Sequence, residues 1–211
     1  MIDRLRQWWL DRETDRMARK PSGRRARAVY GAPDVHSFAW APVLDALRLD
    51  ADDVLLDVGC GGGAFLRHAL ELVPRAVGVD HSRAMVRLAR RTNADLVRAG
   101  RVRIVHGKVG ALPFAEAEFT AVSCLVAFLF FADPVLALRE IRRVLDRERG
   151  RVAIFTVPPE LKGTLAAPEP VASRAHFYGD GELDQLALAA GFVEARTTRG
   201  EQGAQLLVAR G

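Results

Sequence analysis

Short apolar runs alternate with longer amphipathic stretches along the chain from residue 53 to residue 157. A short apolar run is typical of a strand buried in a parallel sheet, whereas apolar positions at every third or fourth residue are typical of a helix. This pattern predicts strands at 54–58, 75–80, 101–107, within 119–130 and at 150–157, and helices at 62–73, 82–97 and 133–148.

The chain after residue 157 adds a proline-containing loop, a helix near 180–191 and two further strands, at 192–199 and 205–210. The last two strands are expected to form an antiparallel pair. Strands that alternate with helices imply βαβ units and a parallel sheet covered on both faces. The sequence therefore predicts an α/β, doubly wound fold, in which ligands bind beyond the carboxyl ends of the strands.

Residues 1–45 precede this regular pattern and are expected to form an N-terminal helical cap or arm, with residues 46–211 as the main domain. Helices are predicted at 2–18 and 35–47, and Pro42 is expected to kink or restart the second one. The arm is proposed to close over a substrate. A packing arm or an oligomer contact, as in a homodimer, is the alternative.

Four glycines follow the first strand in the run VLLDVGCGGGAFL: Gly59, Gly61, Gly62 and Gly63. Glycine permits positive φ and lets a ligand approach the backbone, and the N-terminus of the next helix offers unpaired N–H groups. The turn therefore suits an anionic or polar ligand group. A tight turn without a ligand is the alternative.

A carboxylate at the tip of the second strand, Asp80, follows the glycines at the distance expected of a group that accepts hydrogen bonds from ribose hydroxyls. Asp80 could instead only form the turn before Ser82, which is an expected helix N-cap. The run from Gly59 to Ala64 also matches G-x-G-x-x-A, a variant of the dinucleotide-binding motif. These two features alone leave more than one nucleotide cofactor open.

Four stretches together, DVGCGGG, VGVDHS, GALPFAEAEFTAV and DPVLALREIRRVLDRERGRVAIF, resemble the class I S-adenosylmethionine-dependent methyltransferases. The similarity is greatest to the small-molecule branch that includes ubiquinone/menaquinone-type enzymes, and it covers roughly residues 53–157. The resemblance implies a Rossmann-like, seven-stranded sheet of order 3-2-1-4-5-7-6 with the last strand antiparallel. It also implies S-adenosylmethionine as cofactor and a small-molecule substrate.

The same resemblance assigns roles to individual residues. The cofactor would contact Asp57, Gly59, Cys60, Gly61, Gly63, Asp80, His81, Met85, Ala111 and Leu112. Asp80 would hold the ribose, Met85 would pack on the adenine, and Ala111 and Leu112 would border the adenine. The substrate would contact Trp40, Phe128 and Phe131.

Two positions depart from the family pattern. Lys108 stands where the family usually has an acid that receives the adenine amino group, and lysine offers donors but no acceptor. The stretch AFLFFADP, after the fourth strand, is apolar up to Asp133, which predicts an apolar substrate pocket or ordinary core. A hydroxyl or amine acceptor needs a proton acceptor, and the candidates are His36, His176 and Tyr178.

Composition narrows the remaining choices. The net charge of +5 comes largely from arginines, but no nucleic-acid-binding motif accompanies them, so no nucleic-acid partner is expected. Two cysteines and five histidines show no metal spacing, no apolar run is long enough for a membrane span, and no secretory signal is visible, so a cytoplasmic protein is expected. A non-catalytic cofactor-binding or scaffolding protein and an NAD-dependent oxidoreductase are the alternative functions.

Overall fold

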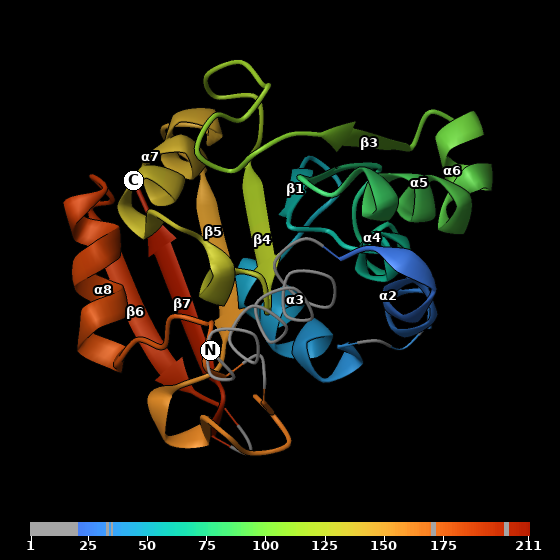
Figure 1. Cartoon of the computed structure of the whole chain (residues 1–211). Helices are drawn as coiled ribbons and strands as arrows, with labels where there is room; N and C mark the ends of the chain where they lie inside the picture. Colours follow the sequence, from blue (N-terminus) through green and yellow to red (C-terminus); the bar gives the residue numbers. More distant parts are fainter. Residues whose placement is uncertain (1–20, 33, 35, 170–171, 201–202) are drawn as a thin grey trace.

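A single seven-stranded sheet organises the computed structural model, which describes residues 21–32, 34, 36–169, 172–200 and 203–211 (Figure 1). The order across the sheet is β3-β2-β1-β4-β5-β7-β6, as predicted. The strands are β1 (Val54–Val58), β2 (Arg75–Asp80), β3 (Val102–His106), β4 (Ala121–Leu125), β5 (Arg151–Thr156), β6 (Glu194–Arg199) and β7 (Gln205–Arg210).

The first five strands pair in parallel, whereas β7 runs antiparallel to both β5 and β6. The strand order reverses at β1, because β2 and β3 lie on one side of it and β4 and β5 lie on the other. The carboxyl end of β1 therefore lies at the switch point of the sheet, where the predicted glycine turn begins.

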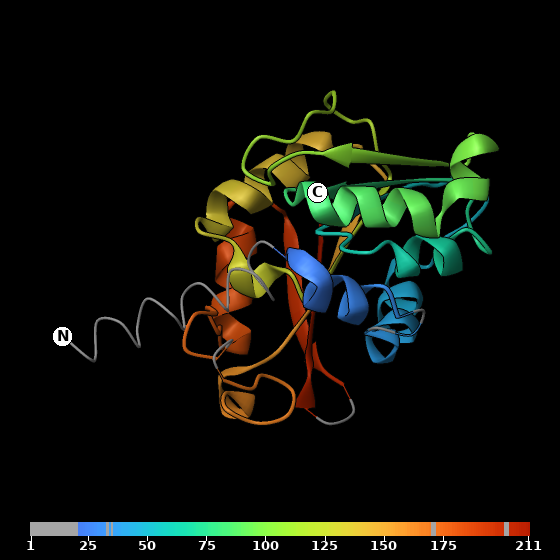
Figure 2. The same ribbon diagram turned by 45° about the vertical axis from the view of Figure 1, so that its right-hand side comes forward.

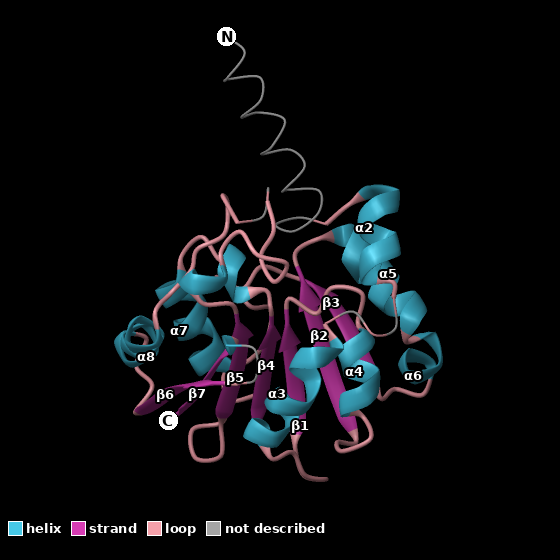
Figure 3. Cartoon of the chain, turned by 90° about the horizontal axis from the view of Figure 1, so that it is seen from below, coloured by secondary structure: helices cyan, strands magenta, loops and turns pink. Residues whose placement is uncertain are grey.

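Helices cover both faces of the sheet, as expected for a doubly wound fold (Figure 3). They are α2 (Gly23–Tyr30), α3 (Trp40–Leu47), α4 (Ala64–Ala69), α5 (Arg83–Thr92), α6 (Ala94–Arg98), α7 (Pro134–Val144) and α8 (Asp180–Ala189). Most buried side chains of α3, α4 and α5 belong to one hydrophobic cluster, and most of those of α7 and α8 belong to another. Successive β1 residues serve the two faces in turn, since Leu55 lies in the first cluster and Leu56 in the second.

The ends of the sheet differ in what covers them. Helix α8 and the β6–β7 pair lie at the end of the sheet opposite to α5 and α6 (Figure 1, Figure 2). Three short 3₁₀ segments complete the described structure: Ser37–Ala39, Phe128–Phe130 and Pro159–Leu161.

Helix boundaries agree with the sequence where a capping residue defines them. Asp133 accepts a hydrogen bond from the backbone N–H of Leu136 at 2.9 Å, and Pro134 occupies the first turn of α7, as predicted. The predicted helix at 82–97 is instead two helices, because Asn93 ends α5 and its side chain donates to the carbonyl oxygen of Ala89 and, across to the glycine turn, to that of Gly63.

The N-terminal part differs more from the prediction. Helix α2 was not predicted, and the helix expected from residue 35 begins only at Trp40, so that Pro42 lies in its first turn, where its missing N–H is tolerated. The predicted helix at 2–18 lies outside the described residues. The predicted domain boundary at residue 45 falls inside α3, whose buried face packs into the core of the sheet.

The described helices include no segment with both the length and the apolarity that crossing a lipid bilayer requires.

Candidate cofactor and substrate site

The turn after β1 has the backbone conformation that its glycines predict. Gly59, Gly61 and Gly63 have φ values of 75°, 52° and 78°, in the left-handed region that side-chain-bearing residues seldom adopt. A Cβ added at Gly59 would lie 2.5 Å from the Cβ of Ala127 in the segment after β4. The turn is thus tightly packed against the neighbouring strand connection.

Helix α2 lies directly on this turn. A Cβ added at Gly62 would lie 1.9 Å from the backbone carbonyl oxygen of Tyr30, the last residue of α2. At Gly61 the nearest atom would be the Tyr30 ring, at 3.5 Å. Glycine is therefore required at position 62 for a second reason besides backbone conformation, namely the close contact with Tyr30 of α2. The sequence did not predict this contact.

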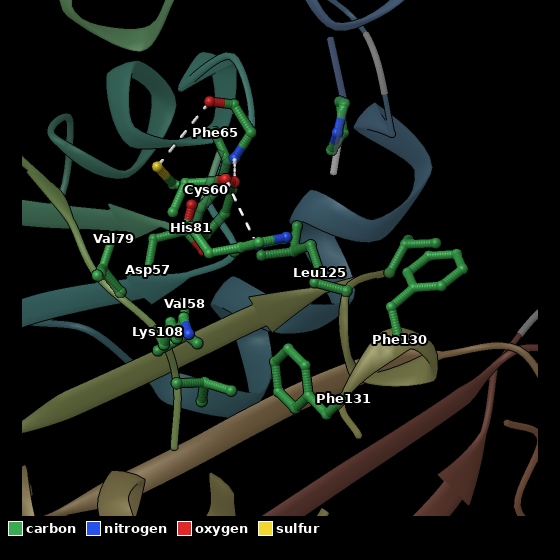
Figure 4. A pocket seen from close by; sticks show the side chains of 18 of the residues that line it. Asp57, Val58, Cys60, Phe65, Val79, His81, Lys108, Leu125, Phe130 and Phe131 are labelled. Carbon is green, nitrogen blue, oxygen red and sulfur yellow. Dashed lines mark hydrogen bonds and ion pairs between the residues drawn. The ribbon is translucent and has the colours of Figure 1, made fainter. Parts of the chain in front are cut away.

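A cavity of about 680 Å³ opens beside the turn, at the carboxyl ends of the strands (Figure 4). Its size is within the usual range for small-molecule sites. The segment around α2 and α3 contributes Pro21, Tyr30, His36 and Trp40 to its wall. The glycine turn, the β3–β4 connection from Gly107 to Ala111 and the segment after β4 complete it.

The two ends of the cavity differ in chemistry. Figure 4 shows Phe130 and Phe131 together on one side, while Val79 and Lys108 lie on the opposite side. The aromatic side continues through Leu125 and adjoins the 3₁₀ segment after β4. The cavity therefore joins a polar end, beside the glycine turn, to an apolar end, beside the segment after β4.

Asp80 holds the glycine turn and the next helix at once. Its two carboxylate oxygens accept hydrogen bonds from the backbone N–H of Gly61 at 3.0 Å and of Ser82 at 2.7 Å. Burial raises the pKa of Asp80, and the bonds from Ser82 and Gly61 oppose that effect. Asp80 thus fulfils the turn-forming role that was one of its two predicted roles, while its side chain still lines the cavity.

A second carboxyl group, that of Asp57, lies at the base of the cavity. It is almost completely buried, and its one side-chain partner among the described residues is the hydroxyl of Ser123, which donates to it at 2.9 Å. Burial raises the pKa of Asp57 to about 7; the Ser123 hydrogen bond opposes the rise and the charge of Asp80 adds to it. A cation bound beside this carboxyl group would stabilise its charged form and lower its pKa. Asp57 is therefore suited to a positively charged ligand group.

His36 is the predicted catalytic candidate that the structure places at the cavity. Its φ of 59° is left-handed, and burial lowers the pKa of its imidazole. The ring meets those of Tyr30 and Phe38 edge-on, at centroid distances of 6.1 and 6.0 Å. The other two candidates lie elsewhere: Tyr178 is buried in the core, and His176 is exposed on the loop before α8.

Most of the other predicted site residues line the cavity; these are Trp40, Asp57, Gly59, Cys60, Gly61, Gly63, Asp80, His81, Ala111 and Phe131. Three do not. Met85 is fully buried on the inner face of α5, and Leu112 and Phe128 belong to the core beneath α7 and α8, where the Phe128 ring packs 5.5 Å from that of Tyr178.

Several lining residues were not among the predicted site residues: Pro21, Tyr30, Phe65, Leu125, Val126, Phe130, Asp133 and Leu136. Pro21 and Tyr30 reach the cavity only through the packing of α2, which no local signal predicts. Leu125 is the last residue of β4 and Val126 follows it, and the carboxyl end of β4 adjoins the switch point. Among the described residues, no group of three or more His, Cys, Asp or Glu side chains is arranged to hold a metal ion.

Comparison with known proteins shows that this chain is similar to methyltransferases. The family model described as a methyltransferase domain matches residues 56–154. Nocamycin O-methyltransferase of Saccharothrix syringae is 34% identical over 209 residues, which cover 82% of this chain and 71% of that protein. Demethylmenaquinone methyltransferase of Thermus thermophilus is 36% identical over 113 residues, which cover 53% of this chain and 50% of that protein.

Solved structures confirm the fold. A SAM-dependent methyltransferase from Aquifex aeolicus matches with a TM-score of 0.68 at 19% identity, over 84% of this chain and 92% of that one. The chain spans about half the length of several of the curated relatives that it matches, with 46–50% of each covered. The chain matches one methyltransferase over most of the length of both proteins, and it has the fold of this family. It therefore belongs to the class I S-adenosylmethionine-dependent methyltransferases.

Proposed function

We propose that this protein transfers a methyl group from S-adenosylmethionine to a small, fairly apolar molecule. The observation that carries the proposal is one cavity in which a glycine turn and two buried carboxyl groups adjoin an apolar wall. A cofactor at the polar end and an acceptor at the apolar end would meet inside this cavity. Methyl transfer depends strongly on such alignment and on the exclusion of water.

The polar end fits the cofactor by its donors and acceptors. When bound, S-adenosylmethionine supplies an electrophilic methyl group on a sulfonium ion. Gly61 and Gly63 leave bare backbone next to the cavity, and the Asp80 carboxylate can accept hydrogen bonds from ribose hydroxyls. Asp57 is a buried acceptor without a cationic partner among the described residues, which suits a positively charged ligand group.

Further cofactor contacts are proposed for Gly59, Cys60, His81 and Ala111, which share the cavity wall. Lys108 lies on the same wall and would face the base of the cofactor with donors only. Recognition of the base would then rest on backbone groups and on the apolar side chains around it.

The apolar end supports a hydrophobic acceptor. Leu125 lines it from the end of β4, Val126, Phe130 and Phe131 line it from the segment that follows, and Trp40 lines the cavity from α3. Such a wall gains free energy from burying an apolar ligand, at about 25 cal/mol for each Å² removed from water. The names of the relatives, which denote methylation of nocamycin and of demethylmenaquinone, agree with a small organic acceptor for this chain.

His36 is proposed as the proton acceptor for the methylated group. Burial lowers the pKa of its imidazole and thereby favours the neutral form at pH 7, which is the form that accepts a proton. The other carboxyl group near the apolar wall, that of Asp133, is already bonded to the N-terminus of α7. Replacement of His36 by Gln should reduce turnover of a hydroxyl acceptor and leave cofactor affinity unchanged.

We also propose that residues 1–45 form a cap, because Tyr30, His36 and Trp40 close one side of the cavity. Deletion of residues 1–28 would remove most of α2. Retained affinity for S-adenosylhomocysteine with lost turnover supports a cap. Loss of the folded state on deletion would assign the segment a packing role.

A thermal-shift panel tests the proposed function against its alternatives. S-adenosylhomocysteine should raise the melting temperature of the wild-type protein, and NAD should not. Asp80→Ala should lose most of the shift. A shift with NAD alone would indicate an oxidoreductase, and no shift with either compound would indicate a non-catalytic protein that uses the same fold.

A further inference from the structure

Exposed arginine side chains gather on two neighbouring helices, α2 and α5, and have no acidic partner among the described residues. On α2 and α5, five exposed arginines form neither an ion pair nor a side-chain hydrogen bond within the part of the chain that the structure describes, and we call them the basic face: Arg24, Arg27, Arg83, Arg87 and Arg91. Some arginines elsewhere on the surface pair with carboxylates, as Arg103 does with Glu118. Others, among them the exposed Arg139, Arg196 and Arg210, form no ion pair with the described residues, so the basic face is set apart by its dense, regular spacing.

The arrangement of the basic face is regular. Arg83, Arg87 and Arg91 recur at every fourth residue, so they form one stripe along α5 with steps of about 6 Å. Neither helix contains an Asp or Glu. The positive charge is therefore not neutralised within either helix, and it presents several guanidinium groups to a partner at once.

The basic face borders the cavity. The hydroxyl of Ser82, the N-cap of α5, donates to the carbonyl oxygen of Pro21 at 2.6 Å and so joins the start of α5 to the entry into α2. Pro21 and Tyr30, before and at the end of α2, both line the cavity. Figure 3 shows α2, α5 and α6 following one another along one edge of the molecule.

The exposed apolar side chains near the basic face distinguish between two polyanionic partners, single-stranded nucleic acid and anionic lipid. Proteins that bind single-stranded nucleic acid place aromatic side chains between the cations, so that bases can stack on them. The large exposed apolar side chains on α2 and α6 are aliphatic instead: Val29 and Val97 are 45% and 38% exposed. Cationic side chains beside exposed aliphatic ones are characteristic of a surface that lies on anionic lipid.

We propose that the basic face docks this protein on the surface of an anionic phospholipid bilayer, with the cavity next to the lipid. A fairly apolar acceptor partitions into bilayers, so docking would bring the cavity to the phase that holds its substrate. Only this last step rests on the proposed function. The docking itself is inferred from the arginines and their surroundings. The protein would lie on the bilayer surface without crossing it.

Sedimentation with vesicles tests the docking. The full chain is mixed with vesicles of phosphatidylcholine alone or with 30% phosphatidylserine, at 50 and 500 mM NaCl. We expect binding to the anionic vesicles at low salt and its loss at high salt. The triple variant Arg83→Gln, Arg87→Gln, Arg91→Gln should bind them about 100-fold more weakly, since each cation near such a surface contributes about fivefold.

A matched control removes the same net charge from the opposite end of the sheet, at Arg139, Arg196 and Arg210, which are also exposed. This control should bind anionic vesicles within about threefold of wild type. Equal losses in both variants would reduce the effect to net charge and overturn the proposal. No binding of wild type at 50 mM NaCl, or tighter binding to a 20-nucleotide RNA than to the vesicles, would also overturn it. Retained binding of S-adenosylhomocysteine by all variants keeps the outcome separate from that of the proposed function.

Discussion

Replacing Asp57 by Asn should stabilise the protein without ligand and at the same time impair cofactor binding. The carboxyl group is buried with one hydroxyl partner, and burial raises its pKa from 3.8 to about 7. Folding therefore opposes ionisation of this group. Asparagine has nearly the same shape, can still accept the Ser123 hydrogen bond and carries no charge.

The size of the effect follows from linkage. In the folded state Asp57 binds its proton more tightly than in the unfolded state, so its contribution to stability falls as pH rises from about 4 to about 7. Above pH 7 the accumulated penalty is about 4 kcal/mol, since a tenfold change in proton affinity corresponds to about 1.4 kcal/mol. At pH 5.5 the same relation gives about 2 kcal/mol. Asp57→Asn should thus raise the free energy of unfolding by about 4 kcal/mol at pH 8 and by about half of that at pH 5.5.

Urea unfolding at pH 5.5 and pH 8 measures these differences. Asp53→Asn is the matched control, because Asp53 lies just before the other end of the same strand and is equally buried. Although burial works against it, hydrogen bonds from Arg151 and Thr120 lower the pKa of Asp53 to about 2. This control should lose stability at both pH values, by about 3 kcal/mol, because it leaves Arg151 with a poorly compensated charge. If Asp57→Asn is destabilised equally at both pH values, the account of its burial is wrong.

Three further outcomes are expected. Gly62→Ala should lower the free energy of unfolding by about 1–3 kcal/mol and expose α2 to proteolysis, because the new Cβ would meet the Tyr30 carbonyl oxygen at 1.9 Å. As the control, Gly181→Ala in α8, where no atom lies within 4 Å of the new Cβ, should leave the stability unchanged or raise it. His36→Gln should reduce turnover of a hydroxyl acceptor by about 10²–10⁴-fold at unchanged affinity for S-adenosylhomocysteine, and unchanged turnover would remove its role as proton acceptor. Asp53 should contribute stability above about pH 4 that is lost as pH falls towards 2, which acid unfolding of wild type and Asp53→Asn can compare.

The sheet could be predicted from the sequence because each of its signals is local. The apolar run of β1 ends at glycines that adopt positive φ, and β2 coincides with the predicted range 75–80. Asp133 and Pro134 define the start of α7 within a few residues of chain. The strand order itself came with the family resemblance, and the structure confirms it.

The N-terminal part of the site could not be predicted, because tertiary contacts determine it. Helix α2 is short and contains several arginines, and it is held by Tyr30 against Gly62 and by the bond from Ser82 to Pro21. A short helix of this kind is marginal without such packing. Its approach to the cavity therefore depends on glycines more than thirty residues away in the sequence.

Three predicted site residues, Met85, Leu112 and Phe128, do not line the cavity, because a sequence motif does not show which way each side chain points. Met85, Val86 and Ala89 share the buried face of α5, so the helical period alone assigns Met85 to the core. The rings of Phe128 and Phe131 meet edge-on at a centroid distance of 5.4 Å beside one 3₁₀ turn, yet of the two only Phe131 reaches the cavity wall. An apolar run does not reveal which of its members point towards a ligand.

Direct titration of the protein with S-adenosylhomocysteine by calorimetry tests the central claim, that the cavity beside the glycine turn is the cofactor site. We expect one binding site per chain, and an affinity about 10–100-fold weaker in Asp80→Ala, because that variant loses a charged hydrogen-bond acceptor. Absence of binding to the wild-type protein, or equal affinity in the folded variant, would contradict it.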